Sequence, residues 1–196
     1  MAEQSSGGSD GAVGDSGMSL VRALTVIAAV LTVGMVPAAG AVAQTSPSMH
    51  FGVMGGLSRG LGDFGDRFGT GPCLGVLSEG APSGFPVGLR GELLLSGPYI
   101  PKGGGSLENF LLGFLLNVVI NFDTPRSGVY LIGGAGMHVV HLPDDHVSTN
   151  SFAVNGGGGI RLPLPGVSIL AEARLHHVWR SGKSPTFIPI VLGVVF

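Results

Sequence analysis

Two adjacent histidines and a nearby serine are the residues of this sequence whose types best suit catalysis. They lie in the segment His176-His177-Val178-Trp179-Arg180-Ser181. A histidine acts as base for a serine hydroxyl only when the two groups lie within about 3 Å. The spacing here gives no support for such a contact and matches no catalytic motif. We therefore predict no catalytic residues and no enzymatic activity.

A second group of reactive side chains lies in the segment His141-Leu142-Pro143-Asp144-Asp145-His146. It offers four possible metal ligands in six residues, but they follow no strong metal-binding spacing. The composition is more typical of a solvated loop tip. We predict no metal site and no cofactor.

Four charged side chains alternate with other residues in two distant segments. Arg90 and Glu92 form one pair, and Glu172 and Arg174 form the other. In an extended strand, residues two apart share a face. These side chains are suited to ion pairing, provided that strands bring the two segments together.

The chain after residue 43 supplies such strands. It holds no apolar run of 18 residues, so a helical membrane span is not expected. Several of its runs are about 9 to 13 residues long, which suits a tilted strand across a bilayer better than the usual soluble strand. We predict eight strands, at residues 49–57, 72–78, 85–95, 109–122, 129–140, 151–162, 167–179 and 187–196.

The run 109–122 is the least regular, and on composition it could be a buried helix. Its residues of one parity are all apolar, from Phe110 to Phe122. Its polar residues share the other parity: Asn109, Asn117 and Asn121. This separation favours a strand.

Connections between the runs alternate in length. The segments 81–84, 123–128 and 163–166 are short and rich in turn residues. The segments 58–71, 96–108, 141–150 and 180–186 are mostly longer and richer in charge. Short turns on one side and long loops on the other are typical of outer-membrane barrels, in which the short turns are periplasmic.

The last run ends in an apolar strip. Residues 188, 190, 192, 194 and 196 share one face of an extended strand, and the last is Phe196. Chain ends usually fray into water, so we interpret this run as a strand that closes the barrel against residues 49–57. Pro189 lacks a backbone N–H, which predicts a bulge near the outer rim.

Parity also assigns the two faces of the barrel. The charged residues oppose the apolar parity, so they are expected to point into the lumen. Arg90, Glu92, Glu172 and Arg174 fall at similar heights on opposite strands, and we predict that they form a structural ion-pair network across the lumen. Parity alone also permits the inverse, a secreted soluble barrel with an apolar interior, as in lipocalins.

Aromatic and glycine positions favour the membrane reading. Aromatics gather near strand ends, which resembles two interfacial girdles. The periplasmic girdle would hold Phe51, Phe85, Phe122, Tyr130 and Phe196, and the outer one Phe110, Phe152, Trp179 and Phe187. Inward positions are rich in glycine, as a narrow lumen would tolerate.

We interpret the first 43 residues as an N-terminal extension and a secretory signal peptide. Arg22, an apolar run at 23–36 and the small residues 38–43 are the three parts of such a signal. We expect cleavage after Ala43, or after Ala41 as second choice, and translation from Met18. The barrel domain would then span residues 44–196.

Composition agrees with this division. Only 11% of the 196 residues are charged and 44% are hydrophobic, which is too apolar for an ordinary soluble domain. The net charge of −2 does not indicate the excess of basic residues that nucleic-acid binding requires. The single cysteine, Cys73, permits no intramolecular disulfide.

Residues 49–196 resemble the small eight-stranded outer-membrane proteins of the OmpX, opacity and OmpA-transmembrane type. The specific parts are Glu172-Ala173-Arg174-Leu175 and the ending Val191-Leu192-Gly193-Val194-Val195-Phe196. The resemblance implies that Leu192, Val194 and Phe196 are recognised by the outer-membrane insertion machinery. Some such barrels are lipid A deacylases with a His-x-Ser pair, but neither His176 nor His177 has a serine two places on.

These observations predict an all-β, eight-stranded, antiparallel up-and-down transmembrane barrel of the outer membrane of a Gram-negative cell. We expect a non-catalytic protein with a structural, surface-interaction or minor permeability role. Its partners would be outer-membrane lipids and the insertion machinery, without nucleic acid, and we expect a monomer. A secreted ligand-binding barrel is the alternative, and a lipid A-modifying enzyme is the third.

Overall fold

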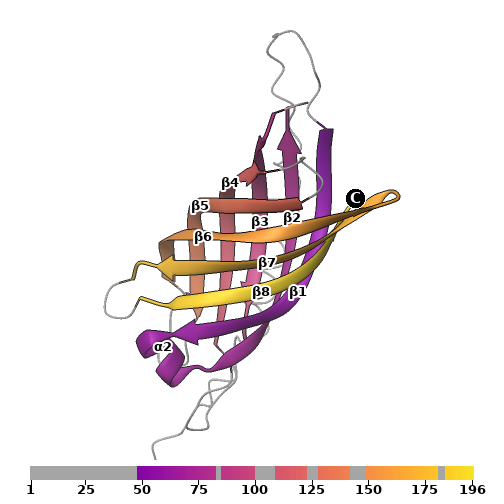
Figure 1. Cartoon of the computed structure of the whole chain (residues 1–196). Helices are drawn as coiled ribbons and strands as arrows, with labels where there is room; N and C mark the ends of the chain where they lie inside the picture. Colours follow the sequence, from indigo (N-terminus) through magenta and orange to yellow (C-terminus); the bar gives the residue numbers. More distant parts are fainter. Residues whose placement is uncertain (1–47, 83–84, 100–108, 123–127, 142–148, 181–183) are drawn as a thin grey trace, which may run out of the picture. The chain divides into compact units, whose positions relative to one another are not determined.

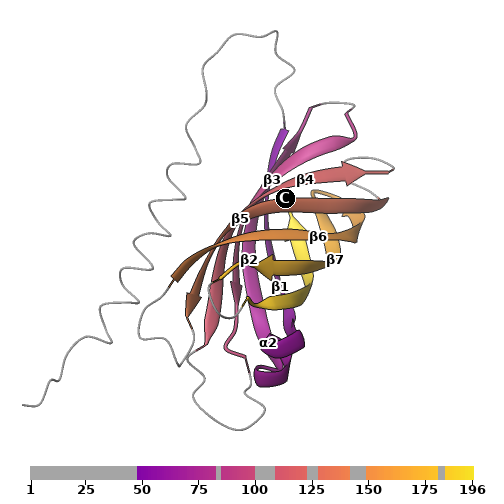
Figure 2. The same ribbon diagram turned by 90° about the vertical axis from the view of Figure 1, so that its left-hand side faces the viewer.

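The computed structural model describes residues 48–82, 85–99, 109–122, 128–141, 149–180 and 184–196. These residues form eight antiparallel strands, each paired with its neighbours in sequence, and the eighth pairs with the first to close a barrel. Figures 1 and 2 show the barrel from two sides, with the C-terminus at the end away from the short helix α2. The predicted fold class is confirmed. The predicted signal peptide lies outside the described residues.

All eight predicted runs are strands, with ends that differ by a few residues. Their bounds are β1 Ser48–Leu61, β2 Thr70–Ala81, β3 Val87–Ser96, β4 Phe110–Asn121, β5 Gly128–His141, β6 Thr149–Leu164, β7 Val167–Val178 and β8 Thr186–Val195. The irregular run is strand β4, and its exposure alternates as its parity predicts.

Connections alternate in length as predicted. Strands β6 and β7 are joined by two residues, with Gly166 at φ 82°. At the other end, β1 and β2 run further than predicted, and the helix α2 (Gly62–Arg67) joins them. Gly62 begins this helix at φ 55°, a conformation that favours glycine. The segment 58–71 was predicted to be a connection without a helix, and the six residues of α2 are too few to show helical periodicity in the sequence.

The closing seam joins β8 to β1 over ten register pairs, from Gly52 with Val195 to Leu61 with Thr186. At its end, Phe51 and Phe196 exchange two backbone hydrogen bonds of 3.0 and 2.8 Å. The predicted bulge at Pro189 is wrong, because the register of β8 with both neighbours is the same on either side of this residue. The ring faces the lumen, and the missing N–H only interrupts the pairing with β7.

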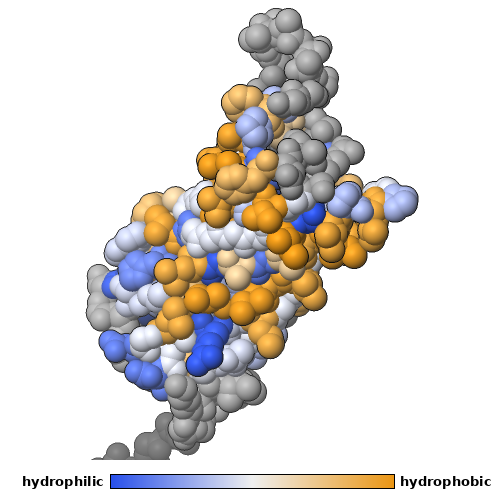
Figure 3. All heavy atoms as spheres, in the orientation of Figure 1, coloured by the Kyte–Doolittle hydropathy of each residue, from blue (hydrophilic) through white to orange (hydrophobic). Residues whose placement is uncertain are grey.

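The exterior of the barrel is apolar. Every strand carries exposed large hydrophobic side chains, including Leu116, Leu131 and Leu192 at 63%, 50% and 66% exposure. Figure 3 shows hydrophobic side chains over much of one face, with hydrophilic ones more frequent toward the end that carries α2. Charged residues of β3 and β7 point inward and are buried. The inverted, lipocalin-like arrangement is therefore excluded.

Two members of the predicted girdles are placed wrongly by the sequence analysis. Tyr130 and Phe187 are 1% and 0% exposed and point into the lumen. On β5 and β8, Tyr130 and Phe187 have the parity opposite to that of the exposed residues. This parity, rather than the position near a strand end, determines which face these side chains occupy. The other seven predicted girdle aromatics are exposed. Among the described residues, no helix is long and apolar enough to cross a membrane.

Deleting Phe196 is expected to impair assembly before it affects the finished barrel. The deletion removes the two hydrogen bonds to Phe51 and an exposed aromatic at the closing seam. We expect the folded, heat-modifiable band on an unboiled gel to be much weaker than that of the wild-type protein. Phe122→Ala is the matched control, because Phe122 is 63% exposed at the same end of the barrel but lies outside the seam. Equal yields of both variants would argue against a special role for the terminal residue.

Candidate functional site in the lumen and at its outer end

The middle of the lumen holds six buried charged side chains, which we call the central network: Glu79, Arg90, Glu92, Arg161, Glu172 and Arg174. Three are cations and three are anions, and none is more than 8% exposed. Their strands, β2, β3, β6 and β7, lie on different sides of the barrel. The lumen is therefore bridged by charge of balanced sign.

The structure brings together the four residues that the sequence analysis proposed for a lumen network. Arg90 Nη1 lies 2.6 Å from Glu172 Oε2, which links β3 to β7 across the barrel. Arg174 Nε lies 2.7 Å from Glu172 Oε1, and Arg174 also pairs with Glu92. These side chains can meet because β3 and β7 lie on opposite sides of the barrel and hold them at similar heights along its axis.

Two further charged residues extend the network. Glu79 Oε2 lies 3.1 Å from Arg90 Nε, and Glu79 Oε1 lies 2.7 Å from Arg161 Nη1. Sequence reasoning missed both. Glu79 lies one residue beyond the predicted end of its strand. Arg161 has the parity of the inward-facing residues of β6, but its charge was not assigned to the lumen network.

Uncharged side chains add hydrogen bonds to the central network. The Tyr130 hydroxyl donates to Glu172 Oε2 at 2.6 Å, and its ring lies between two guanidinium groups, 5.5 Å from Arg90 and 5.2 Å from Arg161. Asn155 donates to Asn117 Oδ1 at 2.8 Å and accepts from Arg174 at 3.4 Å. The network thus connects four strands in addition to β3 and β7, because Glu79 comes from β2, Asn117 from β4, Tyr130 from β5, and Asn155 and Arg161 from β6.

Glycines on the inner face make room for these side chains. A Cβ at Gly159 would lie 2.5 Å from the Tyr130 hydroxyl. A Cβ at Gly157 would press against the Ala173 carbonyl and lie 2.9 Å from Arg174 Cγ. The inward glycines of β6 are therefore a packing requirement of the network.

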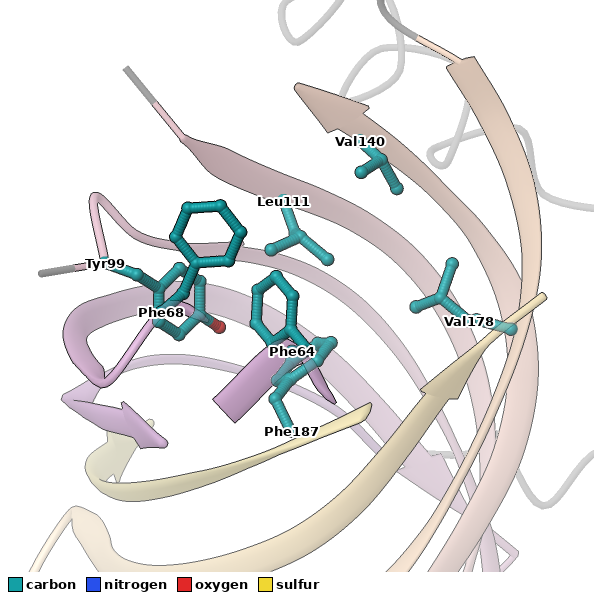
Figure 4. Close-up of a cluster of buried hydrophobic side chains, with 8 residues drawn as sticks. Phe64, Phe68, Tyr99, Leu111, Val140, Val178 and Phe187 are labelled. Atoms are coloured by element: carbon teal, nitrogen blue, oxygen red, sulfur yellow. The ribbon is translucent and has the colours of Figure 1, made fainter. Parts of the chain in front are cut away.

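The outer end of the lumen is closed by a hydrophobic cluster, which we call the outer plug: Phe64, Phe68, Tyr99, Leu111, Val140, Ala153, Val178 and Phe187. Figure 4 shows its side chains converging from α2, the segment after β3, and the outer ends of β4, β5, β7 and β8. The ring centroid of Phe64 lies 5.2 Å from that of Phe68 and 5.1 Å from that of Tyr99. The plug separates the central network from the outer surface.

Polar contacts hold Tyr99 in the plug. Its hydroxyl lies 2.7 Å from Ser58 Oγ on β1. Its backbone N–H donates to Asn109 Oδ1 at 2.5 Å, and Asn109 Nδ2 donates to its carbonyl at 3.1 Å. Burial raises the pKa of Tyr99, so this phenol stays neutral.

The candidate catalytic histidines point in opposite directions. His176 is fully buried in the lumen, whereas His177 faces outward, with Nδ1 2.8 Å from Thr186 Oγ1. Ser181 lies outside the described residues, as do residues 142–148 of the candidate metal-binding loop. In the part of the chain that the structure describes, no three metal-ligating side chains are grouped. Cys73 is a free, buried thiol on the inner face of β2.

The barrel resembles solved structures of other proteins. Neisserial surface protein A matches with a TM-score of 0.52 and 13% identity, over 76% of this chain and 97% of that one. The Yersinia pestis outer membrane protein Ail, in a phospholipid bilayer nanodisc, matches with a TM-score of 0.51 and 12% identity, over 76% of this chain and all of that one. No protein-family model and no curated protein matches the chain.

At these identities the likeness is one of fold. The chain is an eight-stranded, up-and-down β-barrel of the small outer-membrane type. Its apolar exterior and ionic lumen are those of a protein of the bacterial outer membrane.

Arg90 and Glu172 should show strong energetic coupling. Arg90→Ala or Glu172→Ala leaves a buried charge short of its partner, so each should lower the free energy of unfolding by about 3 to 5 kcal/mol. The double variant should lose less than the sum of the two, as measured by urea unfolding in lipid vesicles. Arg59→Ala is the control, because Arg59 faces outward. Strict additivity of the two losses would contradict the contact.

Gly157 and Gly156 offer a matched test of the inner packing. Gly157→Ala should lower the free energy of unfolding by about 1 to 3 kcal/mol, because its Cβ points into the Ala173 carbonyl and Arg174. Gly156→Ala should be neutral or slightly stabilising, because a Cβ there meets nothing within 4 Å. The same unfolding measurement compares them, and equal losses would refute the packing argument.

Proposed function

We propose that the protein is a non-catalytic outer-membrane barrel with a structural or surface-interaction role, and that it is not an open channel. The observation that carries this proposal is the filling of the lumen at two levels, by the central network and by the outer plug. An eight-stranded barrel encloses an interior that side chains nearly fill. A minor permeability role is the less favoured version.

Ion flow would have to break buried contacts. Arg90 is fully buried and pairs with carboxylates on two different strands, and Glu172 is held by Arg90, Arg174 and Tyr130. Moving one of these charges leaves the others unpaired in a medium of low polarity. Past this layer, an ion would still meet the apolar plug.

The side chains suited to catalysis are already engaged elsewhere. His176 and Glu172 are buried in the lumen, away from a lipid substrate outside. His177 and Thr186 do form an imidazole–hydroxyl contact on the exterior. Among the described residues, however, no carboxylate forms a hydrogen bond with either side chain, and such a base normally needs a third group to orient it.

The proposed partners are those that would contact the outer face of the barrel and its C-terminal strand. The apolar belt binds outer-membrane lipids, and Leu192, Val194 and Phe196 engage the insertion machinery during assembly. The barrel is proposed to be monomeric. A role at the cell surface agrees with the names of the two similar proteins, a surface protein and an outer membrane protein.

Planar bilayers test the proposal directly. Purified, refolded barrel should give no steady channel steps across the voltages at which a general porin of the same membrane conducts, because the lumen is filled. Folding is checked in the same sample by heat-modifiable gel mobility. Regular, open steps from the folded protein would contradict the proposal and favour a permeability role.

A further inference from the structure

Two histidines form a buried pair directly beneath the outer plug. His138 comes from β5 and His176 from β7, and they are 1% and 0% exposed. Their ring centroids lie 5.9 Å apart, and the rings are nearly perpendicular, at 84°. Neither residue takes part in the central network.

The surroundings suit only uncharged rings. All four ring nitrogens are buried, and none has a hydrogen-bond partner among the described residues. A buried polar group without a partner is unfavourable, and a buried charge without one is far more so. A protonated imidazole would carry two donors and a positive charge in this position.

The groups around the pair offer no anion to balance that charge. Arg174 of β7 is the nearby cation whose charge acts on both rings, and the carboxylates that pair with Arg174, Glu92 and Glu172, belong to the central network. The other adjacent strands present uncharged residues: Gly113 on β4, Ser151 and Asn155 on β6, and Phe187 on β8. Protonation of either ring would thus add repulsion from Arg174, and protonation of both would add repulsion between the two rings.

The pair is joined to the plug through Phe187. The Phe187 ring stacks on His176 at 4.9 Å and 24°, and meets His138 edge-on at 5.8 Å. Phe187 packs in the same buried cluster as Phe64 and Phe68 of the α2 segment and Tyr99. A displacement of the two rings therefore cannot leave the plug unchanged.

We propose that His138 and His176 form a pH-sensitive latch that keeps the outer plug closed at neutral pH and releases it in acid. In the neutral state, both rings pack against Phe187. Protonation requires water or an acceptor at the ring nitrogens, and water can reach them only if the plug opens toward the outer surface.

The direction of the effect follows from proton binding. The closed state binds fewer protons at these two sites than an open state in which the rings meet water. An exposed histidine titrates near pH 6.5. The closed state is therefore fully favoured above that pH and loses stability as pH falls below it.

Cys73 provides a native reporter of opening. It is 2% exposed on the inner face of β2, and its register partners are Gly56 and Ser96. It lies one inward position below Gly71, where a Cβ would contact Pro98 and Tyr99. Release of Tyr99 and α2 would uncover this thiol.

The experiment measures the rate at which 4,4′-dithiodipyridine labels Cys73 in the purified, folded barrel at pH about 7.5 and about 5. This reagent stays reactive in acid, and comparison of variants at one pH cancels the ionisation of the thiol. We expect the wild-type labelling rate, divided by the rate of the double variant His138→Phe/His176→Phe at the same pH, to rise about tenfold or more between pH about 7.5 and about 5. The double variant His138→Phe/His176→Phe should label slowly at both pH values.

His177→Phe is the matched control, because His177 is the next residue on β7 but faces outward. It should keep the wild-type response. His138→Asn/His176→Asn, which is smaller and also cannot be protonated, replaces the phenylalanine variant if that one fails the gel test of folding. An acid response that persists in a folded double variant, or no acid response in the wild-type protein, would overturn the latch.

Discussion

Pairing of buried charge inside the barrel is the interaction on which the rest of the structure depends. With apolar side chains facing lipid on every strand, the polar residues have only the lumen to occupy. Three arginines and three glutamates there must satisfy one another, because each unpaired charge would be strongly unfavourable. The pairs that cross from β3 to β7 set the relative heights of opposite strands, and the inward glycines of β6 follow from the space that Arg174 and Tyr130 need.

Two different kinds of packing share the lumen. The central network is held by directional contacts, in which each guanidinium has fixed partners. The outer plug is held by aromatic and aliphatic contact, with Tyr99 anchored through Ser58 and Asn109. Directional contacts tolerate little displacement, whereas apolar clusters repack more readily. Any rearrangement of the lumen is therefore expected to begin at its outer end.

Strand number, parity and the principal ion pairs could be predicted because each depends on the two-residue period of the chain. Arg90 and Glu172 were found in this way, since parity fixed their face and turn positions fixed their heights. Predicting Glu79 as a member of the network would have required a more accurate end for its strand, and predicting Arg161 would have required following the parity of β6. Predicting that Tyr130 and Phe187 face the lumen would have required giving strand parity more weight than their position near strand ends. The plug could not be predicted, because it joins the α2 segment, Tyr99 and residues of five strands through contacts that no local pattern encodes.

The run from Gly156 to Gly159 removes side chains from both faces of β6. On the inner side the space is taken by Arg174 and Tyr130, and on the outer side a Cβ at Gly156 would meet nothing. At this point the wall of the barrel is a single layer of backbone. Because Gly156 carries no side chain on the outer face, lipid chains can contact the backbone directly there and approach the lumen through the wall of the barrel more closely than where a leucine or phenylalanine intervenes.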